Sequence, residues 1–257
     1  MVSDFVIDDQ GSCAEIDIPA CRVSPRSIEV GSQSLACPSC RQKCDTHTAD
    51  NLTVCGSCGH IFQTDMNVTV SYDAYYAHQY DSRPVQEMSE VRWNFIQSCL
   101  QLPKGSRVLD VGYGNGAFLK HARAEGMDIY GIDLHDEDFG IPVVNLETKI
   151  HFDLICFFDS LEHFTNFQPL RNLRASNVIV SIPNTPSWLL SSPRIWRHYK
   201  PGEHLHYFSR CSLDNLMRDW GFGDKLTDGY PEDALRGKLT IEGQVQDNIY
   251  TAIYSRA

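Results

Sequence analysis

The chain has 257 residues, of which 42% are hydrophobic, and it carries a formal net charge of −11. This length accommodates one large domain with a buried core plus a small accessory module. No apolar run approaches the roughly 20 residues of a membrane span, and the acidic start MVSDFVIDDQ lacks the pattern of a secretion signal. We therefore expect a cytoplasmic protein without membrane contact. The acidic balance, without a basic stripe, argues against a nucleic-acid partner, because phosphate contacts dominate such binding.

The first two segments differ in cysteine content. Residues 1–35 have weak periodicity and predict an irregular N-terminal arm. Residues 36–70 contain two CxxC pairs, Cys37/Cys40 and Cys55/Cys58, separated by 14 residues. Each pair can turn both sulfurs toward one point, and two pairs complete a tetrahedral S₄ site. This spacing resembles a zinc ribbon and favours zinc over a redox or disulfide role.

A closed S₄ site has no open coordination position, so the expected Zn²⁺ is structural. Cys44 either replaces one ligand or remains a spare thiol, and His60, after the second pair, is expected to be solvated. The ribbon either docks against the catalytic domain, bears on the substrate, or contacts a protein partner.

Residues 71–104 predict an aromatic connector, rich in tyrosine, followed by a linking helix that begins near Pro84. From residue 105 to 257, short apolar runs alternate with segments that can hold helices, which is typical of a parallel sheet covered on both faces. Fold class is thus α/β and doubly wound. The runs expected to form strands are Arg107–Val111, Ile129–Asp133, Pro142–Leu146, Phe152–Phe158, Val178–Ile182 and Ile249–Tyr254.

A glycine-rich loop, Asp110-Val111-Gly112-Tyr113-Gly114-Asn115-Gly116, follows the first of these strands. Such a loop lets a nucleotide-like cofactor approach the backbone. It also satisfies the dinucleotide pattern GxGxxA, which would place a pyrophosphate at the helix start. Asp110 would repel a pyrophosphate but suits S-adenosylmethionine, which is cationic at sulfur and amine. Asp133, at the end of the next strand, can accept both ribose hydroxyls, and so the methyl donor is favoured.

With these residues in place, the chain from about Arg107 resembles class I S-adenosylmethionine-dependent methyltransferases, closest to the group that includes ubiquinone-biosynthesis and sugar methyltransferases. The loop, the stretch Phe158–His163 and the stretch Gly202–Ser209 carry this resemblance. It implies a seven-stranded Rossmann-like sheet, although the span from Asp133 to Val143 is too short for a full crossover helix. The cofactor contacts that follow are Asp110, Gly112, Tyr113, Gly114, Gly116, Asp133, Leu134, Asn145, Leu146, Phe158 and Asp159.

Methyl transfer from a sulfonium is an in-line displacement, and a base helps when the acceptor must lose a proton. Histidine suits that role, which makes His163, His204 and His206 candidates. His163 could instead hold its loop, and His204 with His206 could form a substrate wall or a metal pair. Glu162 is either a pocket residue or a salt-bridge partner.

The predicted activity is methyl transfer to a small-molecule acceptor, a sugar, a nucleotide-linked sugar or another metabolite, at oxygen or carbon. Two alternatives stay open. One is an RNA methyltransferase, since enzymes that methylate guanine in large-subunit ribosomal RNA also place a zinc finger before this fold. The other is a non-catalytic scaffold, which the intact Asp110 and Asp133 disfavour.

Overall fold

The computed structural model describes residues 4–7, 13–16, 34–48, 50–71, 85–134, 138–241 and 243–256. Most of the predicted N-terminal arm and the tyrosine-rich part of the connector lie outside these residues. Within the arm, β1 (Asp4–Ile7) and β2 (Cys13–Ile16) pair antiparallel. No helix in the described part of the chain is long and apolar enough to cross a membrane.

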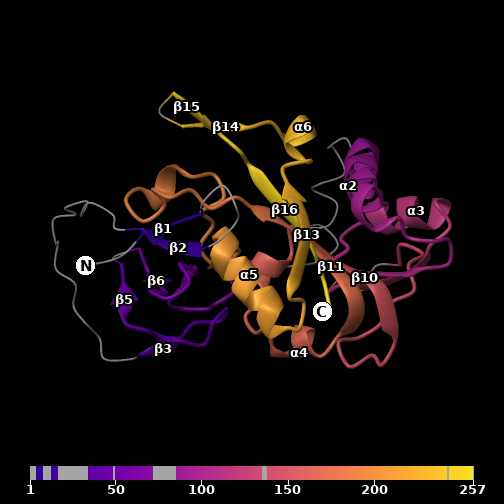
Figure 1. The fold of residues 1–257 in the computed structure, drawn as a ribbon, viewed down its shortest axis with the longest axis horizontal. Coiled ribbons are helices and arrows are strands. Elements are labelled where there is room, and N and C mark those ends of the chain that lie inside the picture. Colours follow the sequence, from indigo (N-terminus) through magenta and orange to yellow (C-terminus); the bar gives the residue numbers. More distant parts are fainter. Residues whose placement is uncertain are drawn as a thin grey trace.

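A six-stranded sheet forms the centre of the molecule, with the strand order β13-β16-β11-β10-β8-β9 (Figure 1). The strands from β9 to β11 are parallel, whereas β16 is antiparallel to both of its neighbours. Apolar side chains on both faces explain why the sequence runs are nearly continuous in hydrophobicity. The strands are β8 (Arg107–Val111), β9 (Asp128–Ile132), β10 (His151–Phe158), β11 (Arg174–Pro183), β13 (Asp224–Gly229) and β16 (Ile249–Ser255).

The predicted strand at Pro142–Leu146 is reduced to a single parallel bridge between Gly131 and Val143. Val144 donates its amide to the Gly131 carbonyl at 2.9 Å, but Pro142 has no amide to donate. The chain then turns at Asn145, whose side chain accepts from the amide of Glu147 at 3.0 Å. The described sheet therefore has six strands, with this bridge beside β9 where a seventh would lie.

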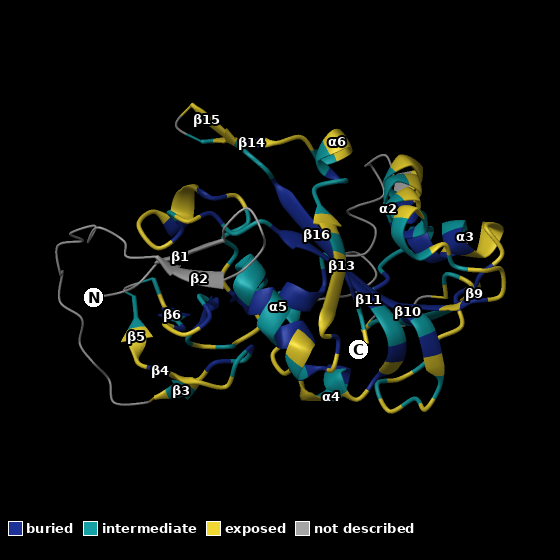
Figure 2. Cartoon of the chain, viewed as in Figure 1, coloured by how far each residue is buried: buried dark blue, intermediate teal, exposed yellow. Residues whose placement is uncertain are grey.

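Helices cover both faces of the sheet, as predicted, and the central strands are the most deeply buried part (Figures 1 and 2). One core cluster joins helices α2 and α3 to the sheet through Trp93, Ile96 and Leu119, and another joins α5 through Leu213 and Leu216. The Ser209 hydroxyl caps α5 by accepting the Ser212 amide at 3.1 Å. The helices are α2 (Val85–Leu100), α3 (Ala117–Ala124), α4 (Gln168–Arg171), α5 (Arg210–Asp219), α6 (Asp233–Arg236), η1 (Leu161–His163) and η2 (Pro193–Ile195).

The cysteine-rich module builds a second sheet, of order β12-β7-β6-β5, that includes a strand from the far end of the chain. In it, His206 pairs with Phe62 and Tyr207 with Ile61. The module thus docks on the later part of the chain through backbone hydrogen bonds. Its strands are β3 (Leu35–Ala36), β4 (Lys43–Cys44), β5 (Thr46–His47), β6 (Leu52–Val54), β7 (Ile61–Gln63) and β12 (His206–Tyr207), and a separate hairpin consists of β14 (Leu239–Ile241) and β15 (Gln244–Gln246).

Candidate active site

The glycine-rich loop is held against the loop that follows β10. Gly112 and Gly116 have φ values of 82° and 72°, which lie in the left-handed region that favours glycine. A Cβ atom on Gly112 would lie 2.6 Å from the Cβ of Ser160. The Ser160 hydroxyl donates to the Val111 carbonyl at 2.6 Å. The two loops predicted to hold the cofactor are therefore joined at the carboxyl ends of adjacent strands.

Asp133 closes the other side of this loop. Its Oδ2 accepts the Gly114 amide at 2.8 Å and its Oδ1 accepts the Leu134 amide at 2.7 Å. Tyr113 is buried against β9, since a Cβ on Gly131 would lie 2.4 Å from its ring. Leu134, in contrast, is 81% exposed beside the Asp133 carboxylate. The predicted ribose-binding carboxylate is thus fixed by the backbone next to an exposed apolar side chain.

Asp110 is 3% exposed, and its Oδ1 has no hydrogen-bond partner among the described residues. Burial raises the pKa of this carboxyl to about 7, and Asp133 raises it further while Arg92 opposes the shift. A buried carboxylate without a partner is costly. A cationic ligand group in the glycine loop would remove that cost, whereas a pyrophosphate would increase it.

Asp159 lies at the centre of a network of buried charges that the sequence does not predict. Arg92 of α2 donates to its Oδ2 at 3.1 Å, and Arg236 of α6 donates to its Oδ1 at 3.0 Å. Glu232, which is fully buried, lies 2.8 Å from Nε of both arginines. Burial works to raise the pKa of Asp159, but the charges of Arg236 and Arg92 lower it below its usual range.

This network brings the Arg92 guanidinium, paired with Asp159 and Glu232, close to the predicted cofactor loop, where its charge acts on Asp110. The Arg92 guanidinium stacks 4.3 Å over the ring of Phe158, another predicted cofactor contact. Arg92 lies 140 residues from Glu232, and no spacing rule marks that contact. Glu232 and Arg236 have the i,i+4 spacing of a helix ion pair, which is a signal that the sequence offers.

Glu162, His163 and His204 lie together in the loop region after β10. Glu162 is 1% exposed, and His163 Nε2 lies 4.0 Å from its Oε1. The rings of His163 and His204 meet edge to face, with centroids 4.8 Å apart. Burial raises the pKa of Glu162 well above its usual value, lowers the pKa of His163, and lowers that of His204 to about 2. Three of the four predicted catalytic residues therefore form one buried group.

His206 contacts a different set of side chains. Its Nε2 donates to the Phe164 carbonyl at 2.8 Å, and its ring lies 4.5 Å from Phe167 and 5.1 Å from His60. His60 is completely buried and stacks on Phe208 at 4.6 Å. The prediction that His60 is solvated was wrong, because the strand β12 packs over it.

The four cysteines of the two CxxC pairs form one group whose sulfurs all lie within 4.8 Å of one another. Cys37 and Cys58 sulfurs are 3.6 Å apart, and those of Cys40 and Cys55 are 3.5 Å apart. Tetrahedral Zn–S bonds of about 2.3 Å put sulfurs about 3.8 Å apart, so the arrangement suits Zn²⁺. Cys44 lies outside this group and donates to the Gln42 carbonyl at 3.6 Å.

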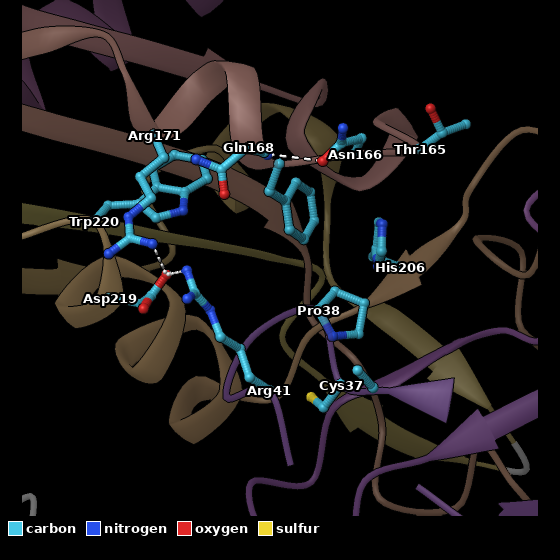
Figure 3. A pocket seen from close by; sticks show the side chains of 12 residues that line it. Cys37, Pro38, Arg41, Thr165, Asn166, Gln168, Arg171, His206, Asp219 and Trp220 are labelled. Atoms are coloured by element: carbon cyan, nitrogen blue, oxygen red, sulfur yellow. Dashed lines mark hydrogen bonds and ion pairs between the residues drawn. The ribbon is translucent and has the colours of Figure 1, made fainter. Parts of the chain in front are cut away.

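A cleft of about 220 Å³ lies where the cysteine-rich module meets the loop after β10 (Figure 3). Cys37 and Pro38 line one side, and His206 lines the other. At its edge, Asp219 pairs with Arg41 at 2.9 Å and with Arg171 at 3.5 Å. The cleft therefore connects the module directly with one of the candidate histidines.

The sheet order and the glycine-rich loop define the class I fold of S-adenosylmethionine-dependent methyltransferases. Residues 76–224 match a family described as methyltransferase domain, which is more than half of the chain. The chain belongs to this methyltransferase-domain family.

Known proteins agree with this assignment. A ubiquinone biosynthesis O-methyltransferase from Paraburkholderia phymatum is 39% identical over 59 residues, which cover 23% of this chain and 25% of that protein. The chain thus spans about a quarter of the length of this curated relative. Among solved structures, a SAM-dependent methyltransferase from Archaeoglobus fulgidus has a TM-score of 0.51 at 18% identity, covering 71% of this chain and 99% of that one.

A chain of the complex between the Haloferax volcanii Trm112 methyltransferase activator and the putative methyltransferase also has a TM-score of 0.51. It is 11% identical, and the match covers 71% of this chain and 96% of that one. At these identities the structural likeness shows the fold alone.

Proposed function

We propose that this chain transfers the methyl group of S-adenosylmethionine to a small-molecule acceptor, a sugar, a nucleotide-linked sugar or a related metabolite, at oxygen or carbon. The observation that carries the proposal is Asp110, a buried carboxylate at the base of the glycine loop whose Oδ1 has no hydrogen-bond partner among the described residues. The amine and sulfonium of S-adenosylmethionine supply the positive charge that this position lacks. Such an enzyme would work in the cytoplasm.

In this proposal the amides of Gly112, Gly114 and Gly116 border the methionine part of the donor, and Asp133 binds the ribose. Leu134, Asn145 and Leu146 border the adenine. Tyr113 supports the loop from below, while Phe158 and Asp159 lie toward the donor's amino-acid end. Arg92, which binds Asp159 and stacks on Phe158, supplies a positive charge for the donor's carboxylate.

The acceptor is proposed to meet the donor beside the loop after β10. His163, with a pKa lowered by burial, stays neutral near pH 7 and can therefore accept a proton from a hydroxyl or an acidic carbon. His206 helps to position the acceptor, because the hydrogen bond from its Nε2 to the Phe164 carbonyl holds the loop after β10 in place.

We further propose the division into a zinc ribbon at 36–70, a linking segment at 71–104 and a catalytic domain at 105–257. Cys37, Cys40, Cys55 and Cys58 would hold a structural Zn²⁺, whose role is to keep the ribbon folded against β12. Neither a nucleic acid nor a separate protein partner is needed to explain this contact. Gln63 and Tyr207 already join the two parts through a side-chain hydrogen bond of 3.0 Å.

Calorimetric titration of S-adenosylmethionine into the zinc-loaded protein tests the cofactor site. We expect micromolar binding that Asp110→Asn and Asp133→Asn weaken at least tenfold, while Asp153→Asn, a carboxylate outside the site, leaves it unchanged. Acceptors are then screened with radiolabelled donor against sugar nucleotides, phenolic metabolites and ribosomal RNA. If the folded protein does not bind the donor, the methyl-transfer proposal fails and a non-catalytic scaffold is favoured. If RNA is the one acceptor that becomes labelled, the acceptor is RNA and not a small molecule.

A further inference from the structure

The side chains of Glu162, His163 and His204 converge in the region after β10, and the first and last of them are buried. One oxygen or nitrogen from each of Glu162, His163 and His204 lies within 4.8 Å of the other two. Both carboxylate oxygens of Glu162 and the Nδ1 of His204 have no hydrogen-bond partner among the described residues. Each such buried polar atom costs about 1–3 kcal/mol when it is left unsatisfied. Their convergence on one point indicates a ligand that all three would share.

Hydrogen bonds among these three side chains do not satisfy the buried polar atoms of Glu162 and His204. The 4.0 Å between His163 Nε2 and Glu162 Oε1 is too long for a hydrogen bond. A second acid, Asp159, is nearby, but Arg92 and Arg236 occupy its carboxylate. Glu162 is therefore the carboxylate of this group that remains available to a cation.

The surroundings of His204 also suit a metal ligand. Glu203 Oε1 lies 3.8 Å from the Nε2 of His204, and Lys200 holds Glu203 with a contact of 2.7 Å. Metal-bound histidines commonly have a carboxylate near the ring nitrogen that does not bind the metal, and the 3.8 Å here would have to shorten to become a hydrogen bond. Here that carboxylate faces Nε2, so the free Nδ1 is the atom left for an ion.

We infer that Glu162, His163 and His204 form a binding site for a divalent transition-metal ion. Two imidazoles and one carboxylate favour Zn²⁺, Co²⁺, Fe²⁺ or Mn²⁺ and leave at least one coordination position open. Ligand atoms bonded to one ion at about 2.1 Å lie about 3.4 Å apart in a tetrahedral site, so side-chain rotations that draw the present group together would complete it. This site is separate from the four cysteines of the ribbon.

The place of the site gives the ion a function, and this part rests on the proposed methyl transfer. Ser160, two residues before Glu162, touches the glycine loop through Val111. An acceptor oxygen in the open position would lose its proton to solvent more easily. That oxygen then forms a bond to the methyl carbon, while the methyl–sulfur bond breaks and its electrons stay on sulfur. With the ion bound, His163 acts as a ligand, and His206 keeps its role in positioning the acceptor.

Metal binding can be measured without any acceptor. Protein is purified with zinc, and the weaker site is emptied with a mild chelator while the four thiolates retain their ion. Co²⁺ is then titrated and followed by its visible d–d absorption. We expect one further equivalent of Co²⁺ per chain, without the charge-transfer band of thiolate ligands.

Variants assign the ligands. Glu162→Gln and His204→Asn should weaken Co²⁺ binding at least 100-fold, and Glu203→Gln about 10- to 100-fold, as is typical for a residue behind a metal ligand. His151→Asn is the matched control, because His151 is an exposed histidine of the same domain. All variants must first show wild-type ribbon zinc and a wild-type melting curve. His163→Asn replaces any variant that does not fold.

A second equivalent of Co²⁺ that disappears in Glu162→Gln and persists in His151→Asn supports the inference. Metal content that stays at one ion per chain, or Co²⁺ binding that is equal in the two variants, overturns it. Because none of these measurements uses S-adenosylmethionine, the inference can fail while the methyl-transfer proposal stands, and the reverse is also true.

Discussion

The buried carboxyl of Asp110 makes donor binding depend on pH in a defined direction. Burial raises its pKa to about 7, so at pH 6 most of the free protein carries a neutral Asp110. If the cationic donor binds the ionised form, the apparent Kd contains the factor 1 + 10^(pKa − pH). This factor is about 11 at pH 6 and about 2 at pH 7. Donor affinity should therefore increase about fivefold over this single unit of pH.

The stability of the free protein should change in the opposite direction. A carboxyl whose pKa is raised on folding stabilises the fold fully only below its unfolded value, and that contribution is lost as pH rises through about 7. For Asp110 the total is about 4 kcal/mol at most. Between pH 4 and pH 7 the wild type should therefore lose stability relative to Asp110→Asn, which has no proton to lose. Saturating donor should reverse this loss.

Calorimetry at pH 6.0, 6.5 and 7.0 measures the effect, and the window ends below the range in which the donor's own amine loses its proton. Asp110→Asn is the matched control, since it keeps the side-chain shape and should bind weakly with little pH dependence. Equal slopes for the two proteins would refute the reasoning. An affinity that falls toward pH 7 in the wild type alone would also refute it, because the neutral carboxyl would then be the binding form.

Three further predictions follow from the structure. Gly112→Ala should destabilise the protein by about 2–3 kcal/mol and weaken donor binding at least tenfold, because its Cβ would lie 2.6 Å from Ser160. Gly105→Ala is the control, since Gly105 has a similar φ of 83° but open space around it, and it should cost only the conformational strain of about 1–2 kcal/mol. Thermal unfolding and calorimetry compare the two variants. Chelation of the Zn²⁺ proposed at the four cysteines should expose the backbone of β12 to hydrogen exchange, while Cys44→Ser should retain zinc and wild-type protection. Equal exchange with and without zinc would contradict this. Arg236→Gln should cost about 3 kcal/mol in denaturant unfolding, because it leaves the buried Glu232 and the half-buried Asp159 with Arg92 as their shared partner. Arg194→Gln should cost under about 1 kcal/mol, because Arg194 is 81% exposed in its pair with Asp50.

The sequence predicts most of the central sheet because buried parallel strands have continuous apolar runs. The exception is β13, whose sequence DKLTDG has no such run. This strand lies at the edge of the sheet and is largely exposed, so burial imposes no pattern on it. The Pro142–Leu146 run shows the opposite failure. It is apolar but includes a proline and begins only a few residues after β9, and the structure gives it one bridge.

Within the candidate site, prediction succeeds where chemistry is local in sequence. The glycine loop, Asp133 and the stretch around Glu162 are each recognisable from a few consecutive residues. Arg92, Glu232 and Arg236 are not, because their roles arise only when α2 and α6 pack beside Asp159. The burial of His60 is a tertiary effect of the same kind, since a strand 146 residues away, at His206, covers its ring.

Strand β12 joins the sheet of the cysteine-rich module, so the fold of that module affects the position of the histidines in and before β12. Side chains alternate along a strand, so a shift of one residue in the pairing of His206 with Phe62 would reverse the direction of each side chain. In the present register His206 lies against Phe167 and His60, while His204, just before the strand, reaches His163. The pairing of β12 with β7 therefore turns both His204 and His206 toward the loop after β10. A structural ion held by the four cysteines would in this way influence the acceptor side of the site without contacting any reactant.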